Sequence, residues 1–293
     1  MKRIRLFLRL LALVLALFLL PALCAAETDA DDPALAEGAD IRVMSYNVMH
    51  PEWEHVPVQG RDEKVAAILM YYMPDVVALQ EANVKWQKAL IPYLVDTGAY
   101  GFACRVSNAP GLVYSTTCFM YNTRTLNLVE ERVLDVEMRD STRVFAVAVF
   151  ETLADGKRFV VTNTHPAPRE QAAKYERNIA YITALAAETA KQYAGLPLIM
   201  AGDFNTPEQA DAYVTLMNEA GVRDAKYAAS VLVRDYPTYF GYQVFPNTDN
   251  MDHCVDHLFV NDAAEVKLFN AVIGHDVQNA SDHIPIYADI SLN

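Results

Sequence analysis

The stretch Ile199-Met200-Ala201-Gly202-Asp203-Phe204-Asn205 decides the fold class of this chain. Its apolar run ends abruptly in a glycine, a carboxylate and a carboxamide, and Thr206-Pro207 then breaks the extended backbone. Buried strands of α/β proteins deliver polar groups to a site at their C-terminal ends in this way. Because residues two apart on a strand point to the same side, we expect Asp203 and Asn205 to face one site. Taken alone, the same residues also fit a plain turn.

The pattern of an apolar run that meets polar groups recurs along the chain. The further examples are Val43–Asn47, Val76–Glu81, Val160–His165, Val255–Val260 with Asp256 near its start, and Ser281-Asp282-His283 before Ile284-Pro285-Ile286. Strands that each carry a hard oxygen ligand or a histidine at one end build a single convergent pocket. Each motif by itself also fits a loop or a surface residue, but unrelated loops have no reason to share an order.

In their residues and in their order along the chain, these motifs resemble those of the endonuclease/exonuclease/phosphatase superfamily. This superfamily includes pancreatic-type deoxyribonucleases, abasic-site endonucleases, neutral sphingomyelinases and inositol polyphosphate 5-phosphatases. The resemblance runs from about Ile41 to Asn293. It implies an α/β fold, more narrowly an α+β sandwich, in which helices flank two packed mixed β-sheets in the four layers of a deoxyribonuclease. It also implies metal-dependent hydrolysis of a phosphoester, and it leaves the substrate open.

Hydrophobic periodicity predicts the same layers. Helices are expected over 61–73, 82–95, 169–193 and 207–220. Asp155-Gly156 predicts a hairpin turn between two strand-like runs. Strands are expected near residues 41, 76, 101, 117, 128, 146, 160, 199, 257 and 286. Uneven alternation of strands and helices suits two sheets with helices outside.

The first 26 residues have the pattern of a secretory signal peptide. A basic start is followed by a leucine-rich run over 10–20 and by small residues that end at Ala26. An uncleaved anchor is disfavoured because the apolar run is shorter than the ~20 residues of a spanning helix. A lipid anchor on Cys24 is disfavoured by the bulky Leu23 before it. We therefore expect an exported protein, secreted or periplasmic, with no integral membrane span after cleavage.

Cleavage near Ala26 would leave a flexible leader over 27–40 and one domain over 41–293. The whole chain has a net charge of −13, and loss of the four basic residues of the signal peptide makes it −17. An acidic surface repels phosphate polymers and lacks the counterion release that drives nucleic-acid binding. A small phosphoester or a lipid headgroup is therefore favoured over long nucleic acid, and we expect a monomer.

Three cysteines remain after cleavage. Cys104 and Cys118 lie in two strand-like runs around a turn at 108–111, so a cross-strand disulfide and two buried free thiols are both open. Cys254 would be unpaired.

Phosphoester hydrolysis needs neutralised phosphoryl charge, an activated water and help for the leaving oxygen. Oxygen ligands without thiolates favour Mg²⁺ or Mn²⁺ over zinc. The resemblance assigns the metal to Glu81 and Asn47, with Asp282 either completing the shell or capping a turn. It assigns Asp203 and Asn205 to the attacking water, His165 and His283 to hydrogen bonds on the developing charge, and Asp256 to holding His283.

Some positions depart from the family pattern. Met49 stands where some nucleases of the family carry an acidic ligand, which makes a second metal position doubtful. His257 stands where the family commonly has tyrosine, and with His253 it could imitate a zinc pair, although a strand would hold the two too far apart. Residues 50–55 are expected to form part of the mouth of the pocket. The aromatic loop 236–242 precedes Asp256, and its rings could stack bases, cover a lipid headgroup or a sugar, or pack together. A non-catalytic binding module and a zinc hydrolase remain the alternative functions.

Overall fold

The computed structural model describes residues 34–51, 56–105, 115–136, 143–242, 253–274, 277 and 279–293. The expected signal peptide over 1–26 and the expected turn at 108–111 lie outside these ranges. The described part of the expected flexible leader, residues 34–40, is tied to the fold: Asp40 accepts hydrogen bonds from the Leu292 backbone (2.7 Å) and the Lys157 ammonium (2.8 Å). No helix within the described ranges is long and apolar enough to cross a membrane.

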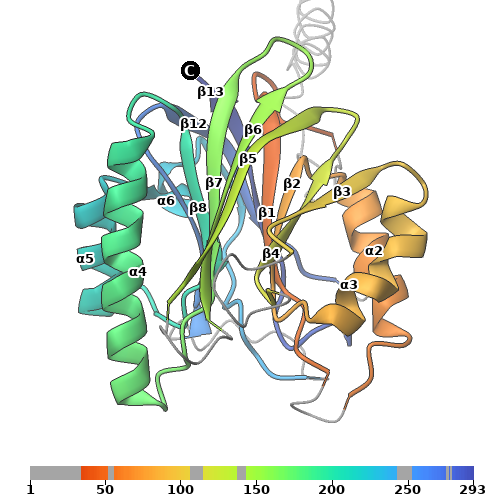
Figure 1. Ribbon diagram of the computed structural model, residues 1–293, viewed down its shortest axis with the longest axis horizontal. Helices are drawn as coiled ribbons and strands as arrows, with labels where there is room; N and C mark the ends of the chain where they lie inside the picture. Colours follow the sequence, from red (N-terminus) through yellow and green to blue (C-terminus); the bar gives the residue numbers. More distant parts are fainter. Residues whose placement is uncertain are drawn as a thin grey trace, which may run out of the picture. The chain divides into compact units, whose positions relative to one another are not determined.

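Two mixed β-sheets pack face to face (Figure 1). The seven-stranded sheet has the order β10 (Val231–Arg234), β12 (Ala264–Ala271), β13 (Ile286–Leu292), β1 (Ile41–Asn47), β2 (Val76–Gln80), β4 (Cys118–Asn122), β3 (Tyr100–Ala103). The six-stranded sheet has the order β5 (Leu126–Asp135), β6 (Val144–Thr152), β7 (Arg158–Thr164), β8 (Leu198–Asp203), β11 (Asp256–Val260), β9 (Arg223–Asp224).

Helices cover the outer faces of both sheets (Figure 1). On the side of the seven-stranded sheet lie α2 (Arg61–Tyr72), α3 (Val84–Leu90) and the π-helical turn Ile91–Val95. On the other side lie α4 (Ala172–Gln192) and α5 (Asp211–Ala220), and the short α6 (Ala225–Ala228) follows β9. The order helices, sheet, sheet, helices confirms the predicted four-layer sandwich.

The apolar run that opened the sequence analysis is β8, and it is buried on both faces. Leu198 and Met200 pack in the cluster that α4 and α5 share with their sheet. Ile199 and Ala201 pack in the main core, which lies between the two sheets. Burying one large apolar side chain stabilises the fold by about 1.5–3 kcal/mol. A strand that is buried on both faces therefore has apolar residues at successive positions, and its sequence is a continuous apolar run.

Three strands were not predicted. β9 has two residues, and β10 is a four-residue edge strand whose Val231 and Leu232 are exposed. β12 pairs with β13, and its register shifts between Val266 and Leu268, which interrupts the alternation of buried and exposed positions. These strands extend the sheets on the side away from β3 and β5.

Strand direction brings the polar ends together. β1 runs parallel to β2, and β7 runs parallel to β8. β13 is antiparallel to β1, and β11 is antiparallel to β8. Consequently four strands end, and two begin, at one edge of the sandwich, where β1 and β2 contact β8 across the layers.

Candidate active site

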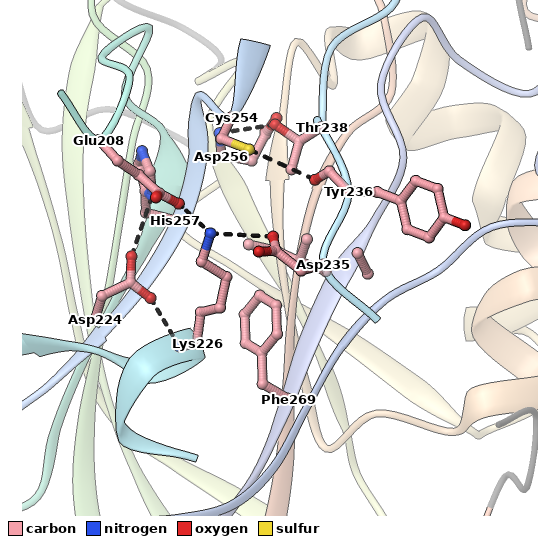
Figure 2. A pocket seen from close by; sticks show the side chains of 12 residues that line it. Glu208, Asp224, Lys226, Asp235, Tyr236, Thr238, Cys254, Asp256, His257 and Phe269 are labelled. Atoms are coloured by element: carbon pink, nitrogen blue, oxygen red, sulfur yellow. Dashed lines mark hydrogen bonds and ion pairs between the residues drawn. The ribbon is translucent and has the colours of Figure 1, made fainter. Parts of the chain in front are cut away.

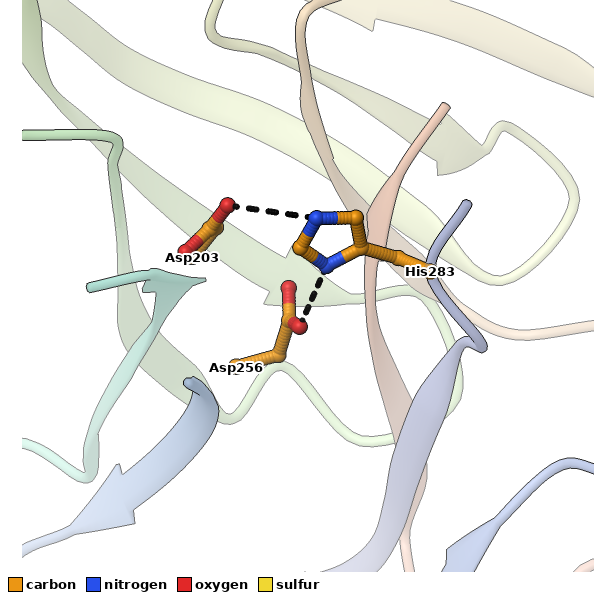
Figure 3. Close-up of side chains that lie close together, drawn as sticks. All are labelled: Asp203, Asp256 and His283. Carbon is orange, nitrogen blue, oxygen red and sulfur yellow. Dashed lines mark hydrogen bonds and ion pairs between the residues drawn. The ribbon is translucent and has the colours of Figure 1, made fainter. Parts of the chain in front are cut away.

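Two groups of carboxylate and imidazole side chains come together among the described residues with ligand atoms close enough to hold one ion. One consists of Glu208, Asp224 and His257 (Figure 2). The other consists of Asp203, Asp256 and His283 (Figure 3). Only the second group lies where the predicted polar ends of the strands meet.

All eight residues singled out in the sequence lie at this edge. Asn47 ends β1, Glu81 follows β2, His165 follows β7, Asp203 ends β8 with Asn205 two residues later, Asp256 begins β11, and Asp282 and His283 precede β13. The backbone register pairs Asp256 directly with Asp203. Five of the eight are buried, and the other three, Glu81, Asn205 and Asp282, are partly exposed.

Asp203 is the centre of the site. Its Oδ2 accepts a hydrogen bond from Asn47 Nδ2 at 3.0 Å and lies 3.4 Å from His165 Nε2 and 3.7 Å from His283 Nε2. Its Oδ1 accepts the backbone N–H of Asn205 at 2.9 Å. Burial, and then the charge of Asp256, raises the pKa of Asp203 to about 7. A carboxylate with such a pKa can bind and release a proton near neutral pH.

Asp256 and His283 form a close pair, with Oδ2 of the carboxylate 2.7 Å from Nδ1 of the ring (Figure 3). Burial opposes the charged ring, but the charge of Asp256 and its hydrogen bond raise the pKa of His283 well above its usual value. The raised pKa favours the imidazolium form of His283, and its Nε2 faces Asp203 Oδ2 at 3.7 Å. The 2.7 Å distance of the Asp256–His283 pair lies within the 2.6–3.2 Å expected for a carboxylate that orients a catalytic ring.

His165 carries the opposite protonation state. Burial, together with the charges of Arg143 and His283, lowers the pKa of His165 well below its usual value. Its neutral ring has one N–H, and Nε2 faces Asp203 Oδ2 at 3.4 Å and Glu81 Oε1 at 3.9 Å. The Arg143 guanidinium donates to the His165 carbonyl at 3.2 Å and so fixes the backbone there.

Glu81 adopts a left-handed backbone conformation (φ 60°) directly after β2. Its carboxylate accepts the backbone N–H of His50, and its side chain keeps 20% exposure. Burial, with the nearby charge of Asp282, raises the pKa of Glu81. A partly accessible carboxylate whose charge is disfavoured by a second carboxylate is suited to receive a cation.

Local chain geometry fixes Asn205. Its backbone has φ 50°, and its Nδ2 donates to the Pro166 carbonyl at 3.1 Å. Three residues earlier, Gly202 (φ 157°) passes so close to Thr164 that a Cβ there would collide with the Thr164 carbonyl. Glycine is therefore required before Asp203. Gly202 and Asp203 end strand β8 and the chain bends at Asn205, so this stretch is the polar end of a strand.

Several supporting residues were missed in the sequence because their contacts join distant segments. Thr238 Oγ1 accepts the backbone N–H of Asp256 at 3.0 Å. The Tyr239 ring lies against the His283 ring, with centroids 5.0 Å apart, and is 39% exposed at the mouth of the site. Only the aromatic composition of 236–242 pointed to this loop.

The donor set fits a hard divalent cation. The oxygens of Glu81, Asn47 and Asp282 lie at the same edge, although Asn47 Oδ1 also accepts the Met49 N–H at 3.0 Å. The second lone pair of that amide oxygen stays available for a ligand. Carboxylates and an amide oxygen without thiolates match the preferences of Mg²⁺ and Mn²⁺.

The group of Glu208, Asp224 and His257 does not contain the zinc pair that His253 and His257 could have imitated. His257 Nε2 lies 2.8 Å from the Thr206 carbonyl oxygen and its Nδ1 lies 3.3 Å from Asp224, whereas the His253 ring lies tilted against the Tyr239 ring, with centroids 5.5 Å apart. Among the described residues, no group of potential metal ligands includes His253. The Lys226 ammonium takes the cation position, in ion pairs with Glu208 and with Asp235, the latter at 3.0 Å (Figure 2).

The three cysteines are free thiols and are buried. The residues before Cys104 pair with those after Cys118, but Cys104 itself has φ 59° and directs its sulfur to the carbonyls of Arg132 and Val147. Of the two alternatives left open by the sequence, the structure has the free thiols.

Comparisons with known proteins agree with this geometry. No curated protein matches the sequence. The fold is similar to that of an endonuclease/exonuclease/phosphatase family protein from Bacteroides thetaiotaomicron (TM-score 0.71, 18% identity, 85% of this chain and 97% of that chain covered). It is also similar to the mannosyl-6-phosphatase of that organism (TM-score 0.70, 18% identity, 85% and 99% covered). A third similar structure is the human nocturnin catalytic domain with bound sulfate (TM-score 0.64, 18% identity, 86% and 94% covered).

At these identities the structural matches speak for the fold alone, whereas the family assignment comes from the sequence. A family model described as Endonuclease/Exonuclease/phosphatase family matches residues 44–283, which spans every motif from β1 to His283. The chain belongs to the endonuclease/exonuclease/phosphatase family.

Proposed function

We propose that this protein is a metal-dependent phosphoester hydrolase that uses Mg²⁺ or Mn²⁺. The observation that carries the proposal is the placement of Asp203 between a neutral histidine and a histidine–aspartate pair, His165 on one side and His283 with Asp256 on the other. Two imidazoles in opposite protonation states around one carboxylate of raised pKa provide both a proton acceptor and hydrogen-bond donors.

Glu81, Asn47 and Asp282 would hold the cation. When bound, the cation neutralises the charge on the phosphoryl oxygens. Met49, which cannot bind a hard cation, follows Asn47 on the same loop, so one metal position is proposed rather than two.

Asp203 would take the proton of the attacking water, because its pKa of about 7 matches that task at neutral pH. Asn205, held by Asp203 and by the Pro166 carbonyl, would orient the water or a phosphoryl oxygen. His283, held protonated by Asp256, would donate a hydrogen bond to a phosphoryl oxygen as charge develops, and His165 would add a second donor. One preorganised donor of this kind contributes roughly 10²–10³ in kcat.

The substrate proposed first is a small phosphoester, such as a sugar phosphate or a lipid headgroup, rather than long nucleic acid. A net charge of −13 opposes a phosphate polymer. The structurally similar mannosyl-6-phosphatase supports a sugar phosphate, and the sulfate in nocturnin supports an anion-binding site on this fold.

We further propose a monomer that is exported after cleavage near Ala26, on the strength of the N-terminal sequence pattern.

Turnover of bis(p-nitrophenyl) phosphate and p-nitrophenyl phosphate, each with Mg²⁺ and with excess EDTA, tests the proposal. Turnover that requires the metal is expected, and a panel of sugar phosphates, phosphoinositides, sphingomyelin and DNA then identifies the substrate class. Binding of phosphoesters without any turnover would identify a non-catalytic binding module instead. Turnover that EDTA leaves unchanged would exclude the metal-dependent mechanism.

A further inference from the structure

Arg61 is a buried arginine whose role none of the site residues explains. It begins α2 and is 3% exposed. Its guanidinium has five N–H groups, and each has a backbone carbonyl within reach. Nε donates to Pro57 (3.0 Å), Nη1 to Val48 (2.8 Å) and Ala280 (3.1 Å), and Nη2 to Met49 (3.1 Å) and, at a longer distance, Val56 (3.5 Å).

The arginine has no ion-pair partner among the described carboxylates. Instead, its guanidinium lies over the Trp86 ring at 4.7 Å and near the Tyr242 ring at 5.9 Å. Both aromatic residues also donate to the neighbouring loops, Trp86 Nε1 to Met49 (3.0 Å) and the Tyr242 hydroxyl to Asn279 (3.4 Å). Burying a charge without a direct counterion costs free energy of desolvation. The contacts of the Arg61 guanidinium are therefore expected to serve a role that offsets this cost.

The carbonyls held by Arg61 flank the site on two sides. Val48 and Met49 come directly after Asn47, and Ala280 comes directly before Ser281-Asp282-His283. The two segments are joined a second time by the Ser281 hydroxyl, which donates to the Asn47 carbonyl at 2.6 Å. The charges of Asp282 and Glu81 attract the Arg61 guanidinium at longer range.

We propose that Arg61 is a positioning residue that fixes the Asn47 end of β1 against the Asp282–His283 segment. One rigid guanidinium donates to backbone carbonyls of both segments and thereby sets the spacing between the Asn47 end of β1 and the Asp282–His283 segment. This role deepens the phosphoesterase function proposed above and rests on it. A lysine has three donors on a flexible stem and cannot reproduce the planar grip.

Arg42 provides a matched control. It is also buried (2% exposed), lies on the same strand as Asn47, and stacks over the Tyr287 ring at 4.4 Å. Unlike Arg61, it pairs with a carboxylate, Asp289, at 2.6 Å, and it lies at the opposite end of β1. Arg42→Lys and Arg61→Lys each remove a buried guanidinium, but only Arg61 contacts the segments that flank the site.

The test compares Arg61→Lys, Arg61→Ala and Arg42→Lys in the full-length protein with bis(p-nitrophenyl) phosphate and Mg²⁺. Arg61→Lys should lower kcat by at least roughly tenfold at an almost unchanged KM, because small misplacements of catalytic groups cost large factors in rate. Millimolar guanidinium, but not ammonium, should restore turnover to Arg61→Ala. Arg42→Lys should lower the melting temperature and leave kcat within about twofold.

Wild-type kcat in Arg61→Lys, or a folded Arg61→Ala that guanidinium does not rescue, would overturn the positioning role. If Arg61→Ala does not fold, Arg61→Lys decides. Absence of turnover in the wild type would instead refute the proposed function. The low-field proton NMR resonance of the His283–Asp256 hydrogen bond tests the spacing of the two segments without turnover. It should shift in Arg61→Lys and stay in place in Arg42→Lys. An unshifted resonance in Arg61→Lys would overturn the inference.

Discussion

Two groups of the same composition, two carboxylates and a histidine, lie back to back in this molecule, and they differ in how their charge is balanced. Asp256 and His257 are neighbours on β11, so their side chains point to opposite faces of the sheet. His257 joins Glu208 and Asp224, where the Lys226 ammonium is 5% exposed and already paired (Figure 2). Asp256 joins Asp203 and His283, where no described lysine or arginine forms an ion pair with either carboxylate.

The difference separates a structural cluster from a reactive one. Around Lys226, the hydrogen bonds and charges of Glu208 and Asp235 outweigh burial and raise the pKa of the ammonium, so the cation is permanent. Around Asp203, burial and a like charge raise the pKa to about 7, so the charge can be altered by a proton or a cation. A carboxylate whose pKa is strongly perturbed by burial and by a specific neighbouring charge is typical of a functional site.

The largest effect should follow from removing the cation or its carboxylate. Excess EDTA, and separately Glu81→Gln, should each reduce turnover by at least roughly 10³-fold. Without the metal ion, the charge on the phosphoryl oxygens would not be neutralised, because no described lysine or arginine forms an ion pair with the acidic residues of the site. Circular dichroism and the melting temperature of Glu81→Gln should stay close to wild type, since the side chain is partly exposed. A wild-type rate for Glu81→Gln at saturating Mg²⁺ would contradict the metal assignment.

The histidine–aspartate pair should act as one unit. Asp256→Asn removes the charge that keeps His283 protonated and oriented, so turnover should fall by roughly 10²–10⁴-fold while the metal still binds. His283→Ala should cost about as much, and the double variant should be barely worse than either single one. Kinetics of the three variants and wild type complete the cycle. Losses that multiply would show that the two residues act independently.

The fold was largely predictable because the strands that build it are continuous apolar runs. β8 and β6 are buried on both faces, and their composition alone identifies them. β9, β10 and β12 were missed for three separate reasons, namely a length of two residues, an exposed edge position and a register shift. Their pairing depends on neighbours that are distant in sequence, which local composition does not report.

The candidate site was predictable to the extent that strand ends carry it. Asp203, His165 and Glu81 each stand at the end of an apolar run. Because strand ends meet at one edge of the sheets, their place in the sequence was enough to predict that the three side chains lie close together. Arg61 and Lys226 had no such signal, because an arginine at a helix start and a lysine in a short helix usually face solvent. Their burial follows from contacts with Ala280 and Asp235, which only the folded chain brings near.

The cluster balanced by Lys226 should affect stability and not turnover. Lys226→Met leaves Glu208 and Asp235 without their shared cation. Breaking a fully buried pair costs about 3–5 kcal/mol, but Asp235 is 35% exposed and partly screened, so we expect about 2 kcal/mol. A fall of roughly 4–8 °C in the melting temperature corresponds to this loss. A large fall in kcat of the folded variant would mean that both clusters serve the reaction.

The smallest effect concerns His257 and depends on pH. Burial alone would lower the pKa of His257, but the hydrogen bond and charge of Asp224, with the Thr206 carbonyl, raise it above 6.5. A histidine with a raised folded pKa adds stability that is complete below the unfolded value and is lost as pH rises through the folded one. His257→Gln should therefore lower the melting temperature most near pH 6, and the gap between variant and wild type should narrow at higher pH. Melting curves of both proteins from pH 5.5 to 9 measure this gap, which we expect to shrink as the pH rises through the folded pKa of His257. A gap that widens with pH would mean that His257 is neutral in the folded protein and that Asp224 is balanced by other donors, such as the Tyr213 hydroxyl at 2.8 Å.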